Sequence, residues 1–259
     1  MNLGAHLHHE CGVTCRILRR KGRFSPVEKR AAKISDCSHF FLHPTMSTNI
    51  AALRQNYALH SLSESDVSPD PIVQFGQWFD EALDSQLIEP NAFSLATATS
   101  DGRPSARTVL LKGFDHQGFM FFTNYESRKG DELNANPQAA ILFTWLELQR
   151  QIRIEGAIVK ISAEESLDYF QSRPRESQIG AWASPQSRPI EARSTIEKNQ
   201  SAITAEYKGV EKLPLPPFWG GYRLIPTWFE FWQGRESRLH DRVVYEQVEG
   251  NWKIGRLAP

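Results

Sequence analysis

Apolar and polar residues alternate with a period of two over most of the chain after residue 92, which predicts a mainly β protein. Clusters of Gly, Asp, Asn and Pro separate the alternating runs. Such tight connections join antiparallel strands, because parallel strands need long crossovers. The predicted strands are 93–99, 105–113, 119–124, 139–148, 151–161, 220–225, 227–233, 243–247 and 252–256. So many consecutive strands favour a closed or partly closed barrel, which leaves few exposed edges.

Helical spacing interrupts this pattern in a few places and predicts helices that flank the barrel. Pro71 begins an amphipathic helix whose apolar residues recur at helical spacing (Ile72, Phe75, Phe79, Leu83 and Leu87). Ser127 is a candidate N-cap for a helix that stops near Pro137, and Ser162 to Glu165 form a capping box for a helix to about Gln171. A short helix is expected over 49–57, and another over 189–207 that ends before Gly209.

The first 45 residues differ in composition from the rest and are expected to be a disordered extension. They hold eight Lys/Arg and three Asp/Glu, five of the eight histidines and all three cysteines (Cys11, Cys15 and Cys37). This composition resembles an organellar targeting peptide, or sequence translated from a misplaced start that precedes Met46. We expect a mobile lid segment over 46–70 and one domain over 71–259.

Composition excludes several classes of protein for the main body. No apolar run approaches the 18 or more residues that a membrane span needs. The body is mildly acidic and lacks the broad basic face of a nucleic-acid-binding protein. It has no cysteine, and no ligand pair at finger-like spacing predicts a metal site. These features favour a cytoplasmic protein, with organellar targeting by residues 1–45 as the alternative.

Basic residues recur at places where their charge is unfavourable without an anionic ligand. Arg107 and Lys112 project from opposite faces of an apolar strand, although Lys112 could also extend to solvent at the strand end. Arg128 and Lys129 lie in the first turn of a helix, where the helix dipole disfavours cations and favours a phosphate. This placement predicts a phosphate site.

A second group of phosphate-binding side chains occurs at a spacing of four. Tyr169, Arg173 and Ser177 would line one side of a helix, and a turn at Pro174 could still bring them together. An ordinary basic helix end is the alternative. Gln186 and Ser187 follow in a polar loop between two prolines and carry no argument alone.

The stretch from Trp228 to Arg242 combines an aromatic strand with a dense cationic turn. Trp228, Glu230 and Trp232 share one face, and three arginines, His240 and Asp241 follow Gly234. A flat conjugated ligand with negative charge would suit this stretch, although a solvated turn is the ordinary interpretation. The chain has no P-loop, no dinucleotide fingerprint and no nucleophile elbow, so an organic cofactor must carry any chemistry.

Taken in order, these motifs resemble the pyridoxamine 5′-phosphate oxidase family. The resemblance runs from about residue 50 to the C-terminus and rests on six segments and the C-terminal Arg256-Leu257-Ala258-Pro259. The segments are 107–112, 127–129, 172–182, 217–221, 231–234 and 238–242. It implies an antiparallel, Greek-key-like split β-barrel with flanking helices, and a homodimer that holds two FMN molecules at its subunit interface.

The resemblance also assigns site residues by position. The expected FMN phosphate and ribityl contacts are Arg107, Arg128, Lys129, Gln186 and Ser187. The other expected flavin contacts are the main chain of Thr108, Val109, Leu110 and Leu111, together with Lys112, Phe122, Thr123, Gln151, Trp232 and Arg242. Lys112, Tyr169, Arg173 and Ser177 would bind the substrate phosphate. Arg238, Leu239 and His240 would face the pyridine ring, with Arg238 and His240 as catalytic residues. Arg54 and Tyr57 would contribute from the lid.

The implied reaction is oxidation of pyridoxine or pyridoxamine 5′-phosphate by O₂ to pyridoxal 5′-phosphate. A hydride would pass from C4′ to flavin N5, and hydrogen peroxide would be released, with ammonia from the amine. Neither a nucleic acid nor a membrane is an expected partner, and no metal is expected. Two alternatives stay open: another split-barrel flavoprotein such as a flavin reductase, and a non-catalytic module that binds flavin or pyridoxal phosphate.

Overall fold

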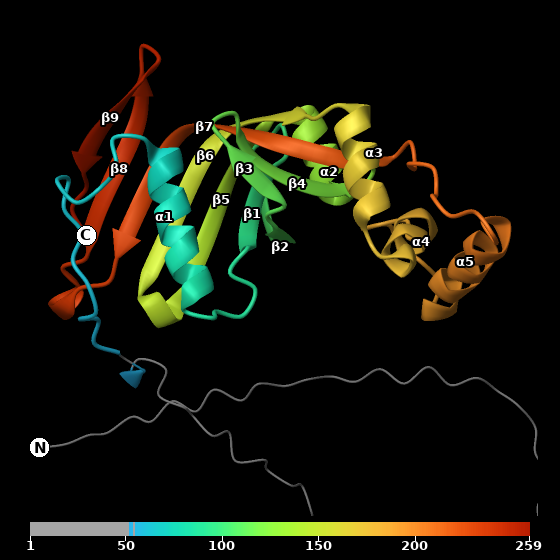
Figure 1. Ribbon diagram of the computed structural model, residues 1–259, viewed down its shortest axis with the longest axis horizontal. Helices are drawn as coiled ribbons and strands as arrows, with labels where there is room; N and C mark the ends of the chain where they lie inside the picture. Colours follow the sequence, from blue (N-terminus) through green and yellow to red (C-terminus); the bar gives the residue numbers. More distant parts are fainter. Residues whose placement is uncertain (1–51, 54) are drawn as a thin grey trace, which may run out of the picture. The chain divides into compact units, whose positions relative to one another are not determined.

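The computed structural model describes residues 52–53 and 55–259. Nine strands form one sheet: β1 Ala92–Ala98, β2 Pro104–Leu110, β3 Gly113–Asp115, β4 Gly118–Asn124, β5 Gln138–Trp145, β6 Arg150–Lys160, β7 Trp219–Gln233, β8 Asp241–Val248 and β9 Asn251–Arg256. The helices are α1 Pro71–Asp84, α2 Arg128–Ala135, α3 Ala163–Ser172, α4 Arg175–Ala183 and α5 Arg193–Glu206, with short 3₁₀ turns η2 Leu146–Leu148 and η3 Glu236–Arg238. Figure 1 shows these elements along the chain.

Every strand pairing in the described part of the chain is antiparallel, as the tight turns predict. The strand order is β2-β1-β5-β6-β7-β4-β3, and β8 and β9 extend the sheet from β7. These pairings do not join β2 to β3, so the sheet is a half-barrel rather than a closed barrel.

The long strand β7 organises the sheet. Its first part pairs with β4 and its last part with β8, while β6 runs along its other edge. Pro226 lies where the partner changes from β4 to β8, and the register with β6 shifts there. Proline is tolerated at such a bulge because its missing N–H breaks no ladder bond. Gly156 lies opposite, and a Cβ there would come within 2.0 Å of the Ile225 carbonyl oxygen, so the bulge requires glycine.

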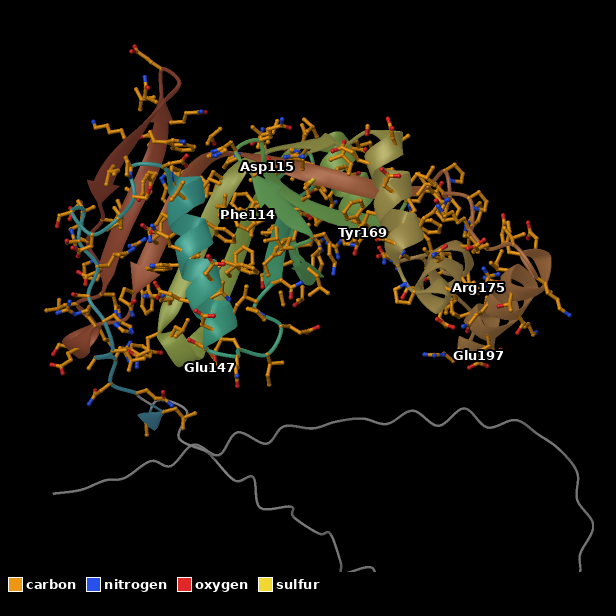
Figure 2. All side chains as sticks on the ribbon, viewed as in Figure 1. Phe114, Asp115, Glu147, Tyr169, Arg175 and Glu197 are labelled. Carbon is orange, nitrogen blue, oxygen red and sulfur yellow. The ribbon has the colours of Figure 1, made fainter. Side chains whose placement is uncertain are left out.

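Helix α1 covers one face of the sheet and completes the main core. Phe75 is fully buried and contacts Phe114, Phe119 and Phe143; Phe114 is labelled in Figure 2. Burial of each such ring stabilises the fold by about 1.5–3 kcal/mol. A smaller cluster of Phe170, Ile179, Leu213 and Trp219 holds α3 and α4 against the start of β7.

Local signals in the sequence set several boundaries correctly. Asp70 caps α1, Ser127 caps α2, and Ser162 with Glu165 forms the predicted capping box of α3. Glu249 and Gly250 both have positive φ, as a two-residue hairpin turn requires.

Other boundaries differ from the sequence predictions, and each difference has a physical reason. Strands 220–225 and 227–233 are one strand, because the bulge absorbs Pro226 without ending β7. Helix α4 was not predicted. Pro174 was interpreted only as a turn at the end of the preceding helix, but it is also the N-cap of α4. The helix predicted over 49–57 is absent at residues 53 and 55–57, and residues 49–51 and 54 lie outside the described part of the chain. No helix in the described part has the length and apolar character to cross a membrane.

Candidate functional site

A cavity of about 510 Å³ gathers most of the predicted phosphate-binding residues; we call it the basic cavity. It lies between β2, β4, the first turn of α2 and the junction of α3 with α4. Its lining is Arg107, Thr108, Val109, Leu110, Lys112, Phe122, Thr123, Lys129, Tyr169, Arg173, Pro174, Ser177, Gln186 and Trp219. Leu111, Arg128 and Ser187 were also expected to contact FMN, but they are not part of this lining.

Arg107 and Lys112 line the same cavity, which corrects the prediction that they serve opposite faces of one strand. Strand β2 ends at Leu110, so the alternation of side chains stops before Lys112. The Lys112 N–H instead donates to the Met120 carbonyl, where the chain enters β3. The change of direction brings both cations to one space.

Lys129 is a buried amine, 9% exposed, with neutral hydrogen-bond partners. Its Nζ donates to Thr123 Oγ1 and Gln186 Oε1, both at 2.9 Å, and more weakly to Ser127 Oγ. Among the described residues no carboxylate lies within ion-pair distance of it. Burial, and then the charge of Arg107, lower the pKa of Lys129 to about 8. An anion in the cavity would supply the missing counter-charge.

Arg173 is the second cation in the cavity that lacks a partner for a polar group among the described residues. It is the C-cap of α3, and its guanidinium lies 4.8 Å from the ring centre of Trp219. Its Nη1 is buried and has no hydrogen-bond partner in the described structure, and burial lowers its pKa. A buried guanidinium N–H group without an acceptor is costly. A ligand oxygen at this position would satisfy it.

The break at Pro174 brings Tyr169, Arg173 and Ser177 to the cavity wall, as the sequence predicted. Tyr169 projects from α3 (Figure 2), and its ring stacks on Phe122 with centroids 3.9 Å apart. Phe122 in turn stacks on Trp219 at 5.5 Å. The three rings form a rigid aromatic wall beside the two phosphate-binding groups.

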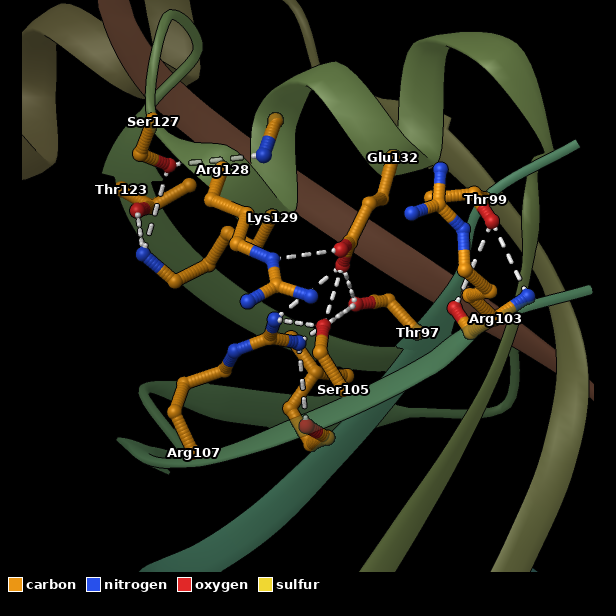
Figure 3. Close-up of polar contacts among 12 residues, drawn as sticks. Thr97, Thr99, Arg103, Ser105, Arg107, Thr123, Ser127, Arg128, Lys129 and Glu132 are labelled. Carbon is orange, nitrogen blue, oxygen red and sulfur yellow. Dashed lines mark hydrogen bonds and ion pairs between the residues drawn. The ribbon is translucent and has the colours of Figure 1, made fainter. Parts of the chain in front are cut away.

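The sequence analysis missed the hydrogen-bond cluster around Glu132, which Figure 3 shows. The Glu132 side chain is 4% exposed and accepts hydrogen bonds from Thr97, Ser105, Arg107 and Arg128. Although burial raises its pKa, these hydrogen bonds together lower it to about 2. The only sequence signal was the spacing of Arg128 and Glu132, four apart on α2.

The remaining predicted residues form a second group, which we call the Trp232 group: Gln151, Trp232, Arg238, His240 and Arg242. Gln151, Trp232 and Arg242 lie in one row across β6, β7 and β8, because they are direct cross-strand partners. Arg242 also pairs with the buried Glu230 and donates to the Ala258 carbonyl. These contacts fix the position of its guanidinium.

Arg238 and His240 follow in the turn after β7. Ser237 and Arg238 have positive φ values of 54° and 63°, an unusual backbone for residues other than glycine. The His240 ring packs on Trp232 at 4.5 Å, and its Nδ1 accepts a hydrogen bond from the Arg235 N–H. Burial and the charge of Arg238 lower its pKa, although Asp241 raises it. The neutral ring therefore carries its proton on Nε2.

The segment before α1 lies against this turn. Tyr57 contacts Trp232 and His240 edge-on, with centroids 6.0 and 5.9 Å apart. Together with Arg238 and neighbouring residues, it lines a space of about 440 Å³. Leu239 is 69% exposed and lines a separate open pocket with Leu59 and His60. Arg54, the other residue expected in the lid, lies outside the described residues.

The two groups are far apart in one protomer. Trp219 lines the basic cavity, and Trp232 lies 13 residues further along the same strand β7. At about 3.3 Å per residue, this separation is roughly 40 Å. The basic cavity fits the phosphates expected of FMN and substrate, since it holds Lys129 and Arg173 without their anions. Its lining does not include Gln151, Trp232 or Arg242, which are the other side chains expected to contact the flavin.

Comparisons with known proteins identify the family of the chain. Residues 79–206 match a family model described as pyridoxamine 5′-phosphate oxidase. Residues 219–259 match one described as the C-terminal dimerisation region of pyridoxine 5′-phosphate oxidase. A pyridoxine/pyridoxamine 5′-phosphate oxidase of Cupriavidus metallidurans is 58% identical over 213 residues, which cover 82% of this chain and all of that protein. One from Paraburkholderia phymatum is 59% identical over 215 residues, covering 83% of this chain and all of that protein.

Solved structures support the fold. The crystal structure of PhzG from Burkholderia lata, in complex with tetrahydrophenazine-1-carboxylic acid, has a TM-score of 0.73 and 34% identity. It covers 78% of this chain, and all of PhzG is matched. An FMN-binding protein from Nostoc punctiforme, related to pyridoxamine 5′-phosphate oxidase, has a TM-score of 0.59 at 20% identity. The match covers 75% of this chain and 99% of the Nostoc punctiforme chain. At this identity the similarity concerns the fold alone.

Proposed function

The chain belongs to the pyridoxamine 5′-phosphate oxidase family, and we propose that it binds FMN and oxidises pyridoxine and pyridoxamine 5′-phosphates to pyridoxal 5′-phosphate. The observation that carries this proposal is the presence in one cavity of the buried Lys129 and the half-buried Arg173, which have no anionic partners among the described residues. FMN and the substrate each bring one phosphate. A cavity with two such cations can bind both the FMN phosphate and the substrate phosphate.

The FMN phosphate is assigned to Arg107 and Lys129, and the substrate phosphate to Lys112, Tyr169, Arg173 and Ser177. Arg128, Gln186 and Ser187 would assist with the FMN phosphate and ribityl chain. The main chain from Thr108 to Leu111, with Phe122 and Thr123, would contact the flavin. Of the substrate group, Tyr169 and Arg173 pack on the aromatic wall, through Phe122 and Trp219 respectively.

The site is proposed to be complete only in a homodimer. The basic cavity and the Trp232 group lie roughly 40 Å apart along β7 in one protomer. No ligand of FMN size reaches both. A second copy of the chain can bring its own Trp232 group to the first copy's cavity, and two-fold symmetry then makes two equal sites. The match of residues 219–259 to a dimerisation region supports this arrangement.

Bound FMN would supply a two-electron oxidant for the C4′ carbon of the substrate, with O₂ as the final electron acceptor and hydrogen peroxide as its product. The protein's part is to bind and orient. Arg238 and His240 would face the pyridine ring, where the His240 Nε2–H can donate a hydrogen bond to the substrate. From the amine substrate, water then hydrolyses the imine to pyridoxal 5′-phosphate and ammonia.

The direct test is flavin absorbance of the purified protein, followed by peroxide release when pyridoxamine 5′-phosphate is added in air. We expect one ammonia for each peroxide. Bound flavin without turnover would favour a non-catalytic binding module. Turnover of reduced nicotinamide, without oxidation of pyridoxamine 5′-phosphate, would favour a flavin reductase.

The substrate phosphate site has its own test in Arg173→Ala. This change should raise the KM for pyridoxine 5′-phosphate at least about tenfold, because a charge-assisted bond to the phosphate is lost. Arg193→Ala is the control, since Arg193 is exposed and pairs only with Glu197 among the described residues. An unchanged KM in Arg173→Ala would remove the assignment of Arg173 and favour the flavin reductase.

A further inference from the structure

We propose that Glu132 is the positioning residue of the basic cavity: it fixes the guanidinium groups of Arg107 and Arg128 so that they receive the cofactor phosphate. This inference rests on the proposed function of the cavity. Glu132 does not line the cavity itself, so it would act through the arginines. Four observations carry the inference: the burial of Glu132, its partners, the direction of its hydrogen bonds and the charge balance.

The partners of Glu132 come from three elements that meet behind the cavity. Arg128 Nε donates to Oε1 at 2.9 Å, along helix α2. Arg107 Nη2 donates to Oε2 at 3.2 Å, from strand β2. Thr97 of β1 and Ser105 of β2, which are direct cross-strand partners, also donate to Oε2. One carboxylate therefore ties the helix to both strands and contacts two cations (Figure 3).

The carboxylate also sets the direction of the surrounding hydrogen bonds. Ionised Glu132 can only accept, so the hydroxyls of Thr97 and Ser105 must donate to it. Their oxygens are then free to accept from Arg107, and they do, from Nη1 at 2.5 Å and from Nη2 at 2.6 Å. Arg107 Nη1 also donates to the Leu95 carbonyl. The guanidinium is held on two sides, with its Nε unpaired among the described residues.

The balance of charges around Glu132 also supports a role in phosphate binding. Arg107 and Lys129 line the cavity, the more exposed Arg128 lies next to Lys129 on α2, and Glu132 pairs with two of these three cations, Arg107 and Arg128. The remaining charge of about two matches a phosphate near charge −2. Glu132 therefore allows clustered cations to stay in place before the anion arrives.

A purely structural role is the alternative, because a buried ion pair could simply hold α2 on the sheet. The two roles differ in one respect. A positioning role concerns the phosphate, so it affects FMN but not riboflavin, which has the same ring system and no phosphate. A structural role affects the binding of both flavins alike.

The experiment compares Glu132→Gln with the wild type by titrating apoprotein with each flavin and following quenching of flavin fluorescence. Glutamine keeps the shape, but its amide group donates towards the arginines and reverses the hydroxyls. We expect the ratio of the riboflavin Kd to the FMN Kd to fall about tenfold or more. Asp131→Asn is the matched control, because Asp131 is on the same helix, pairs with Arg188 and does not contact Arg107. Its ratio should equal that of the wild type.

A second variant keeps the test decisive if Glu132→Gln does not fold. Ser105→Ala removes only the hydroxyl that links Arg107 to Glu132. It should lower the ratio about threefold or more in the wild-type background, because hydrogen bonds to a carboxylate and a guanidinium are lost. Where both changes can be combined, Ser105→Ala should add little to Glu132→Gln, because the link is already lost.

Two results would overturn the inference while leaving the proposed function intact. In one, the wild type prefers FMN strongly and Glu132→Gln keeps that preference. In the other, Glu132→Gln weakens FMN and riboflavin equally. A wild type that binds both flavins with equal affinity would overturn the proposed cofactor site, and the role of Glu132 with it.

Discussion

At the scale of single residues, the basic cavity is organised by cations that the protein leaves unpaired. Lys129 has only neutral partners, and Arg173 has a buried N–H group without an acceptor among the described residues. Both are unfavourable for the free protein and become favourable when a phosphate binds. Glu132 is the counterpart, a carboxylate that stabilises the neighbouring Arg107 before binding.

Lys129 gives a prediction about pH. Burial, and then the charge of Arg107, lower its pKa to about 8 from an ordinary 10.5. Between these values the unfolded chain binds a proton that the folded chain lacks, so stability without ligand should rise with pH across this window. FMN affinity should do the opposite and weaken as the pH rises through about 8, because the ammonium is lost while the phosphate stays a dianion.

Flavin titrations between about pH 7 and about pH 9.5 would measure this dependence. Riboflavin should show no such change, and Lys129→Arg should flatten the FMN curve, since arginine stays charged. A riboflavin curve that falls in parallel with the FMN curve would show that another group is responsible.

At the scale of elements, the segment over 55–62 is tied to the Trp232 group by few bonds. Gln149, which has positive φ, uses Oε1 to accept hydrogen bonds from the N–H groups of Ala58 and Leu59. Its backbone carbonyl accepts from the Gly234 N–H. Asp241 holds Leu62 by a further bond. Gln149 therefore links the segment that carries Tyr57 to the turn that carries Arg238 and His240.

Loss of this link should release the segment without unfolding the sheet. Gln149→Ala removes the acceptor, so amide exchange at residues 58 and 59 should speed up at least about fivefold, as expected for loss of about 1 kcal/mol. Gln149→Glu keeps an acceptor oxygen and should exchange like the wild type. Hydrogen exchange followed by mass spectrometry measures both variants. Equal exchange in wild type and Gln149→Ala would mean that other contacts hold the segment.

At the scale of the whole molecule, strand β7 separates the two groups that the proposed site needs. The basic cavity lies at its start and Trp232 near its end. The separation along the strand is roughly 40 Å. In the proposed homodimer, each protomer would supply one group to each site.

Mixed dimers test this arrangement. Arg173→Ala damages the basic cavity and Arg238→Ala damages the Trp232 group, so each variant alone should lose most activity. Co-expression should give mixed dimers in which one site carries both changes and the other carries neither. With random pairing, half of the dimers are mixed, and about a quarter of wild-type kcat/KM should return. Activity that stays at the mean of the two single variants would place each site within one protomer.

Much of the fold was predictable because its signals are local. Period-two alternation identified the strands, and Pro71, Ser127 and Ser162 identified the helix starts. The boundaries at Pro226 and Pro174 could not be predicted in this way, because proline lacks an N–H and its effect depends on the partners around it. In β7 the neighbouring strand changes at Pro226, so no bond is lost. After α3, Pro174 begins a new helix instead of a loop.

In the candidate site too, some features could be predicted from the sequence and others could not. The cations, the aromatic residues and their order along the chain could be predicted, because they are properties of residue type and spacing. Which of these residues meet depends on how the strands end and pair in the folded chain. The tertiary structure brought Arg107 and Lys112 into one cavity where β2 ends, placed Glu132 behind Arg107, and put Trp232 at the far end of β7. Spacing along a chain sets which face a side chain occupies, but strand ends and cross-strand pairing set its neighbours.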